Sequence, residues 1–127
     1  MEETKFYRCE KCGNIVGLIH AGGGELTCCG QAMTELSANT TDAAQEKHVP
    51  VPEVQGNKVV VKVGSTAHPM TEKHLIEWIY LQTKKGGQRH VLTAEDAPQA
   101  EFLVADGDAP VAVYAYCNLH GLWKAAV

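Results

Sequence analysis

Apolar and polar positions in the second two thirds of the chain form short runs separated by turn residues. Runs of this length, bounded by Gly, Asp and Pro, are typical of β-strands. The strands predicted on this basis are Lys58–Val63, Leu75–Thr83, Gln88–Thr93, Glu101–Ala105, Val111–Cys117 and Leu122–Ala125. Because turn signals recur about every 8 to 12 residues, the pattern predicts a β-sandwich of the immunoglobulin type.

Two details of this pattern bear on the strand assignment. The run Leu75–Leu81 is apolar enough for a helix, but its β-branched and aromatic residues and its short length favour a strand. Gly86-Gly87 predicts a hairpin turn after this strand, and Asp106-Gly107-Asp108 predicts another turn. The expected fold class is therefore mainly β.

The first third of the chain has a different composition. Residues 1–36 contain four of the five cysteines, and the small polar residues of 37–47 show no apolar period, as expected of a linker. A segment of about 36 residues buries too little apolar surface to fold alone, so a metal is expected to hold it together. The predicted organisation is a metal-bound domain, 1–36, a linker, 37–47, and a β-sandwich domain, 48–127.

Charge and hydropathy exclude several classes of partner. The 127 residues include 11 basic and 15 acidic side chains, a formal net charge of -4, which provides no basic field for nucleic acid and no polybasic membrane patch. No apolar run approaches the roughly 20 residues that cross a bilayer, and the first residues are too polar for a signal peptide. We therefore expect a cytoplasmic protein without nucleic-acid or membrane partners.

The cysteines of the first segment have the spacing of metal ligands. An odd total of five cysteines, in a reducing compartment, argues against a disulfide framework. Cys9 and Cys12 form a C-x2-C pair followed by Gly13, which suits a tight turn, whereas Cys28 and Cys29 are adjacent. A distorted tetrahedral site with four sulfur ligands is predicted, and both zinc and iron fit such a site. Cysteines packed as small apolar side chains are the less favoured alternative.

A second group of candidate ligands comes from three separate segments. These ligands are His48 in 46–50, His68 and His74 in 68–74, and Cys117 and His120 in 117–121. Each segment lies at a strand end or in a loop, where functional residues collect. Four imidazoles and one thiolate exceed the ligand set of a structural zinc site and leave one position vacant on an octahedral ion. A ferrous ion there would keep a net positive charge, and Lys47 would add another, so the site would attract a small anion.

Together these segments resemble desulfoferrodoxin, the two-iron superoxide reductase family. The resemblance covers essentially the whole chain, with a desulforedoxin-like first domain and a neelaredoxin-like second domain. It implies two iron ions per chain. The ligands that it implies are Cys9, Cys12, Cys28 and Cys29 for a rubredoxin-like Fe(Cys)4 centre, and His48, His68, His74 and His120 with axial Cys117 for a ferrous centre whose sixth position is open. His20 and His90 lie outside these segments and are expected to have no ligand role.

The resemblance also implies an activity and partners. The reaction is the one-electron reduction of superoxide to hydrogen peroxide without release of dioxygen, with electrons from rubredoxin or a similar carrier, in a homodimer. Lys47 is the candidate for attracting the anion and orienting proton delivery, and Glu46 resembles the carboxylate that closes onto ferric iron. The alternatives are a two-iron electron carrier without a substrate and a zinc-ribbon interaction module on a β-sandwich.

Overall fold

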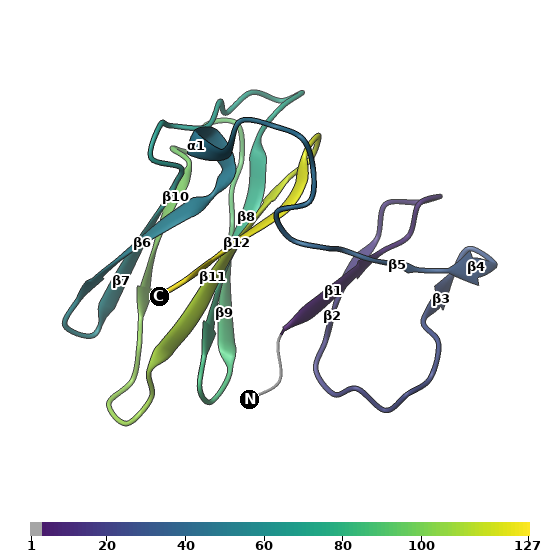
Figure 1. Cartoon of the computed structure of the whole chain (residues 1–127), viewed down its shortest axis with the longest axis horizontal. Coiled ribbons are helices and arrows are strands. Elements are labelled where there is room, and N and C mark those ends of the chain that lie inside the picture. Colours follow the sequence, from purple (N-terminus) through teal and green to yellow (C-terminus); the bar gives the residue numbers. More distant parts are fainter. Residues whose placement is uncertain (1–3) are drawn as a thin grey trace. The chain divides into compact units, whose positions relative to one another are not determined.

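The chain folds into two compact units, one formed by the residues up to Ser37 and the other by Ala38–Val127 (Figure 1). The computed structural model describes residues 4–127, so residues 1–3 of the predicted first domain lie outside the described residues. The described chain is mainly β in both units, as predicted, with a small four-cysteine unit ahead of a larger β-sheet unit.

The first unit has very little apolar core. Its strands are β1 (Lys5–Arg8), which pairs antiparallel with β2 (Ile15–Leu18) and β5 (Thr34–Glu35), and the separate hairpin of β3 (Thr27–Cys28) and β4 (Gln31–Ala32). Among residues 4–37, the buried apolar side chains are those of Phe6 and Cys9. Burial of one large side chain contributes only about 1.5–3 kcal/mol, far less than ordering a segment of this length costs. The unit therefore depends on its cysteine cluster.

The strands of the second unit form two antiparallel sheets. One sheet has the order β10 (Gln99–Leu103), β7 (Lys58–Val63), β6 (Pro50–Gln55), and the other has the order β12 (Gly121–Ala126), β11 (Pro110–Cys117), β8 (Ile76–Thr83), β9 (Gly87–Val91). All pairings between neighbouring strands are antiparallel hydrogen-bonded ladders. Figure 1 shows both sheets ending close to the short helix α1 (Gln45–His48).

Alternate residues of the strands fill one core between the two sheets. Val59, Val61 and Val63 of β7 are buried, and so are Ala115 and Cys117 of β11. All five belong to a single cluster of buried side chains, as expected when strand side chains point alternately inward and outward. The prediction of a sandwich is therefore confirmed. Cys117 is the last residue of β11, so the buried core extends to the end of this strand.

Most predicted strands are observed with bounds shifted by a few residues, and β7 has the predicted bounds. The predicted hairpin turn is also present, because the N–H of Thr83 donates to the carbonyl of Gly86 at 2.8 Å. Strand β6 was not predicted, since Pro50 and Pro52 argue against a strand. Both prolines are tolerated because β6 is an edge strand of its sheet.

The helix α1 was not predicted either. Its four residues, Gln45–His48, are too few to show a helical apolar period, and residues 45–47 were assigned to the linker. Within residues 4–127, no helix is long and apolar enough to cross a membrane.

Candidate metal centres

The four cysteines of the first unit converge from two tight turns. Cys9 and Cys12 lie in the turn after β1, and Cys28 and Cys29 lie in the β3–β4 hairpin. The first turn is closed by the N–H of Gly13, which donates to the carbonyl of Cys9 at 2.9 Å. Gly13 has a φ of 82°, a left-handed conformation that glycine adopts without strain. The expectation of a tight turn at Gly13 is therefore confirmed.

The adjacent pair fits the same cluster because of the turn between β3 and β4. Cys28 pairs with Gln31 across the hairpin, and the two residues between them, Cys29 and Gly30, have φ values of 54° and 77°. Two consecutive left-handed residues form a type I′ turn, which suits a two-residue hairpin. A left-handed conformation costs a non-glycine residue such as Cys29 about 1 kcal/mol. This cost is consistent with a sulfur that must be directed at a ligand.

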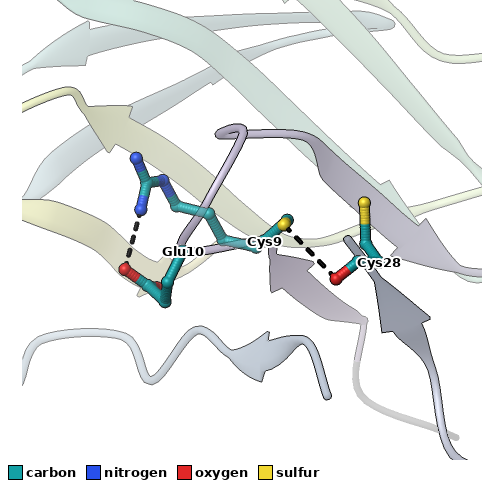
Figure 2. Close-up of polar contacts among 4 residues, drawn as sticks. Cys9, Glu10 and Cys28 are labelled. Atoms are coloured by element: carbon teal, nitrogen blue, oxygen red, sulfur yellow. Dashed lines mark hydrogen bonds and ion pairs between the residues drawn. The ribbon is translucent and has the colours of Figure 1, made fainter. Parts of the chain in front are cut away.

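The sulfur positions fit a tetrahedral metal ion. Cys28 Sγ lies 3.7 Å from Cys12 Sγ and 3.9 Å from Cys29 Sγ, and all four sulfurs lie within 4.8 Å of one another. Cys9 Sγ lies 3.7 Å from the carbonyl of Cys28, so the turn after β1 and the β3–β4 hairpin face each other (Figure 2). Four sulfurs placed about 2.3 Å from a central ion are about 3.8 Å apart. The observed contacts bracket this distance.

The thiol pKa values of this cluster also indicate a need for a cation. A hydrogen bond from the backbone N–H of Cys12 lowers the pKa of Cys9 to about 6. Hydrogen bonding to the Cys12 sulfur raises the pKa of Cys29 to about 12. The four groups therefore do not all ionise at neutral pH by themselves, whereas a coordinated metal ion deprotonates its thiol ligands.

The predicted ligands of the second centre come together at the end of the sandwich. His48 ends α1, His68 and His74 lie between β7 and β8, Cys117 ends β11, and His120 precedes β12. The four imidazoles form a closed square whose consecutive ring centroids are 4.7 Å (His48–His68), 4.7 Å (His68–His74), 5.2 Å (His74–His120) and 4.9 Å (His120–His48) apart. His48 and His74 are opposite each other, with centroids 6.4 Å apart.

Hydrogen bonds fix which nitrogens face the centre of this square. The Nδ1–H of His48 donates to the carbonyl of Ala44 at 2.7 Å, and the Nδ1–H of His68 donates to the carbonyl of Pro69 at 2.6 Å. A neutral imidazole that donates through Nδ1 has a lone pair on Nε2. The two Nε2 atoms are 3.2 Å apart and have no proton to share. A cation would relieve this repulsion, since nitrogens at right angles and about 2.1 Å from an ion are about 3.0 Å apart.

The remaining donors point to the same position. His120 presents Nδ1, which lies 3.1 Å from His48 Nε2 and 3.8 Å from Cys117 Sγ. His74 Nε2 is buried and has no hydrogen-bond partner among the residues that the structure describes. Leaving a buried polar atom unsatisfied costs about 1–3 kcal/mol, which a metal bond would offset. The donor atoms of His48, His74, Cys117 and His120 lie within 4.8 Å of one another, and His68 adjoins them through His48.

Burial keeps the imidazoles of this cluster in the state that binds metal. Desolvation lowers the pKa of His68 to about 4 and also lowers the pKa values of His48 and His74. These rings are therefore neutral at pH 7 and retain their lone pairs. Beside this desolvation, the positive charge of Lys47 makes a minor contribution to the lowered pKa of His48 and His74, and the Glu46 carboxylate acts in the opposite direction on His48.

Cys117 has a different environment. Its side chain is fully buried, and this burial raises the pKa of the thiol. The backbone N–H groups of Leu119 and His120 hydrogen-bond to its sulfur and act in the opposite direction. Such N–H groups stabilise a thiolate once a cation is present.

The loop between β7 and β8 determines the position of Glu46 and Lys47. Both side chains are exposed on α1, but the carbonyl of Glu46 accepts hydrogen bonds from the N–H of Thr66 at 2.8 Å and the hydroxyl of Ser65 at 3.3 Å. Gly64 packs directly against this carbonyl, because a Cβ at position 64 would lie 2.5 Å from its oxygen. The backbone of α1 is thus fixed while its charged side chains face solvent.

Two residues near the second centre were missed in the sequence. Trp123 donates its Nε1–H to the carbonyl of His120 at 3.1 Å, and its ring centroid lies 4.9 Å from that of His48. Asn118 lies between the two ligands of its segment and bonds to the loop that carries His74. The ring contact of Trp123 with His48 and the backbone contacts of Asn118 each join segments that are distant in the chain, for which a sequence pattern contains no signal.

The two histidines that were expected to have no ligand role lie outside both clusters. His20 and His90 are exposed. The ring of His90 packs against Phe102, with centroids 4.6 Å apart.

Sequence comparison places both units of the chain in known families. Residues 40–126 match the family described as Desulfoferrodoxin, and residues 1–36 match the family described as Desulfoferrodoxin, N-terminal domain. The desulfoferrodoxin of Syntrophotalea carbinolica is 52% identical over 123 residues, which cover 97% of this chain and 96% of that protein. The desulfoferrodoxin of Nitratidesulfovibrio vulgaris is 52% identical over 124 residues, which cover 97% of this chain and 96% of that protein.

Solved structures give the same result. The crystal structure of the superoxide reductase from Treponema pallidum superposes with a TM-score of 0.83 at 39% identity, covering 98% of this chain and 99% of that one. The one-iron superoxide reductase from Giardia intestinalis superposes with a TM-score of 0.56 at 38% identity, covering 65% of this chain and 97% of that one.

The chain has two clusters of candidate ligands. One is formed by four cysteines in the small unit, and the other by four histidines and one cysteine on the β-sandwich. Together they define a metalloprotein with two separate centres. Both clusters are consistent with the two iron sites of a desulfoferrodoxin. The chain belongs to the desulfoferrodoxin family, in which it has both the amino-terminal domain and the superoxide reductase domain.

Proposed function

We propose that this protein is a superoxide reductase whose reaction centre is the histidine-cysteine cluster of the second unit. The proposed ligands are His48, His68, His74, His120 and Cys117. The observation that carries the proposal is the closed square of imidazoles with a buried thiol beside it. A structural zinc site has four ligands, so a fifth donor favours a reaction centre. Family membership supports the same conclusion.

The residues of the site have distinct tasks in this reaction. These residues would hold an iron ion, which when bound would supply the single electron that, with two protons, converts superoxide into hydrogen peroxide. The carbonyls of Ala44 and Pro69 orient His48 and His68 through their Nδ1–H groups. Burial shields the sulfur of Cys117 from water, and neighbouring backbone N–H groups would stabilise a thiolate there once the ion is bound.

Lys47 has the proposed tasks of attracting superoxide and orienting the delivery of a proton. The chain has a net charge of -4, but fields are screened beyond roughly 8 Å at physiological salt. Local charge therefore governs the final approach, and the charge of Lys47 acts on both His48 and His74. Glu46 is assigned to the oxidised resting centre, where its carboxylate would occupy the remaining ligand position. Its exposure next to His48 supports this role.

The first unit and the partners form a second part of the proposal. We assign residues 1–36 to an Fe(Cys)4 domain with the ligands Cys9, Cys12, Cys28 and Cys29, residues 37–47 to a linker, and residues 48–127 to the reductase domain. A rubredoxin-like carrier is proposed as the electron donor, and a homodimer in the cytoplasm as the working form. These assignments rest on the resemblance to the family.

The test combines metal analysis with a direct assay. Protein purified without added metal should contain two iron ions per chain. Superoxide generated by pulse radiolysis should oxidise the second centre in a second-order step and yield hydrogen peroxide without dioxygen. Zinc at both sites, or iron-loaded protein that does not consume superoxide, would overturn the proposal. Added azide should shift the spectrum of the second centre, whereas an electron carrier with a saturated centre would show no shift.

A further inference from the structure

Asn118 joins the segment that carries Cys117 and His120 to the loop that carries His74. Its side-chain Oδ1 accepts the N–H of Leu75 at 3.0 Å, and its Nδ2–H donates to the carbonyl of Lys73 at 2.9 Å. These two groups belong to the peptide units on either side of the Cα of His74. A single amide therefore holds both peptide units that position this ring.

The backbone of Asn118 adds a third contact. Its N–H donates to the carbonyl of Leu75 at 3.3 Å. Both segments are thus joined immediately beside Cys117 on one side and His74 on the other. The side-chain bonds of Asn118 to Leu75 and Lys73 span 43 and 45 residues of the chain. They therefore link candidate ligands that are far apart in the sequence.

His74 depends on its backbone more than His48 and His68 do. Those two rings are oriented directly, because each donates its Nδ1–H to a main-chain carbonyl. The hydrogen bonds of His74 act on its peptide groups: its N–H donates to the Thr71 hydroxyl at 3.0 Å, and its carbonyl accepts the N–H of Thr71 at 2.9 Å. Its buried Nε2 has no partner within residues 4–127. The backbone of this loop therefore determines which positions the His74 ring can reach.

We propose that Asn118 is a positioning residue, which fixes His74 opposite His48 and so closes the square of imidazoles. This inference rests on the proposed function of the second cluster as a metal centre. An amide is suited to the task because it offers an acceptor and a donor at once and carries no charge. Aspartate, when ionised, keeps only the acceptor, and alanine offers neither group. The two side-chain bonds can therefore be separated by substitution.

The test measures metal retention in the full-length, iron-loaded protein. Asn118→Ala should increase the rate at which a chelator removes iron from the second centre by about 10- to 100-fold, the usual effect of losing a group that orients a ligand. The absorption band of the oxidised second centre should shift as well. The Fe(Cys)4 band of the same sample serves as an internal reference and should not change. Asn118→Asp should also lose iron faster than the unmodified protein, because it has no hydrogen for the Lys73 carbonyl.

Asn57→Ala is the matched control. The Asn57 side chain donates to Asp106 at 2.7 Å in the same unit, in a hairpin that contributes no predicted ligand. This variant should retain iron and its spectrum unchanged. Should Asn57→Ala lose iron as fast as Asn118→Ala, the effect is general destabilisation and the proposal is overturned. Unchanged iron loss and an unchanged spectrum in both Asn118 variants overturn it too. If Asn118→Ala does not fold, Asn118→Asp decides between these outcomes.

Iron retention is measured without superoxide, which separates this inference from the proposed activity. An unmodified protein that holds iron in both centres but fails to consume superoxide would contradict the activity. The comparison of Asn118 variants would still show whether this residue holds His74 in place.

Discussion

The two units position their candidate ligands in opposite ways. In the first unit, four sulfurs come from two short turns within twenty-one positions, and among residues 4–37 Phe6 and Cys9 are the buried apolar side chains. In the second unit, five donors come from three distant segments, and the sandwich core extends to one of them, Cys117. We therefore expect the first unit to need its metal in order to fold. The second unit is folded by its core and presents a site that is already assembled.

Removal of the metal ions should have the largest effect and should separate the two units most clearly. Chelation of both ions should unfold the first unit, because binding of a structural metal contributes roughly 10 kcal/mol or more to the folding of so small a domain. The second unit should remain folded. Amide hydrogen exchange resolved by segment measures both outcomes in one sample. Persistent protection of β1 and β5 without metal would contradict the assignment.

Both tryptophans, Trp78 and Trp123, lie in the second unit, so their fluorescence reports on that unit separately. The emission intensity should change on chelation, because Trp123 lies next to the candidate ligand His48, but the metal-free protein should still show a cooperative urea transition. Loss of this transition in metal-free protein would mean that the second unit also requires its ion to fold.

Cys12→Ser should have a large but local effect. The substitution removes a sulfur that lies 3.7 Å from Cys28 Sγ, so the first centre should lose its absorption and the first unit its protection from exchange. The second centre should keep its iron and its reaction with superoxide. Cys117→Ser is the paired variant with the reverse outcome, in which the first centre remains intact. If Cys12→Ser abolishes superoxide consumption while iron stays in the second site, the first centre is required for the reaction.

Acidification should destabilise the metal-free second unit through its buried histidines. Burial lowers the pKa of His68 to about 4, below its value of about 6.5 in an unfolded chain. The unfolded state therefore binds more protons between these values, and the stability of the metal-free second unit should fall as the pH decreases from about 6.5 towards 4. The urea midpoint of the tryptophan signal should be lower at pH 5 than at pH 7. His68→Gln should weaken this dependence, whereas His90→Gln, at an exposed position, should not. An equal pH dependence in all three proteins would refute the role of burial.

The first cluster could largely be predicted from the sequence, because its ligands lie close together along the chain. The C-x2-C spacing and Gly13 indicate a tight turn, and the structure confirms it. The adjacent pair is explained only by the structure, since the left-handed Cys29 allows a type I′ turn that a sequence pattern does not specify. The short β-branched run of residues 58–63 likewise predicted β7 with its observed bounds, because a preference for β-structure is a local property.

The second cluster was not readable from spacing alone. His48 and His120 are 72 residues apart, yet His48 Nε2 and His120 Nδ1 lie 3.1 Å from each other. Their residue types and their places at strand ends or in loops suggested the grouping, and the resemblance to a family then supplied the role of each ligand. The role of Asn118 escaped even that reasoning, because it acts on main-chain groups of another segment.

Lys47→Ala should have the smallest effect, because an exposed charge is partly screened by salt. Removing this charge should lower the second-order rate constant with superoxide by up to about tenfold at low salt and flatten its dependence on ionic strength. Glu46→Gln is the matched control on the same helix: it removes a negative charge, so the rate should stay equal or rise slightly. Pulse radiolysis over a range of salt concentrations measures both. Equal rates for Lys47→Ala and the unmodified protein would exclude Lys47 from anion capture and leave that task to the positive charge of the centre itself.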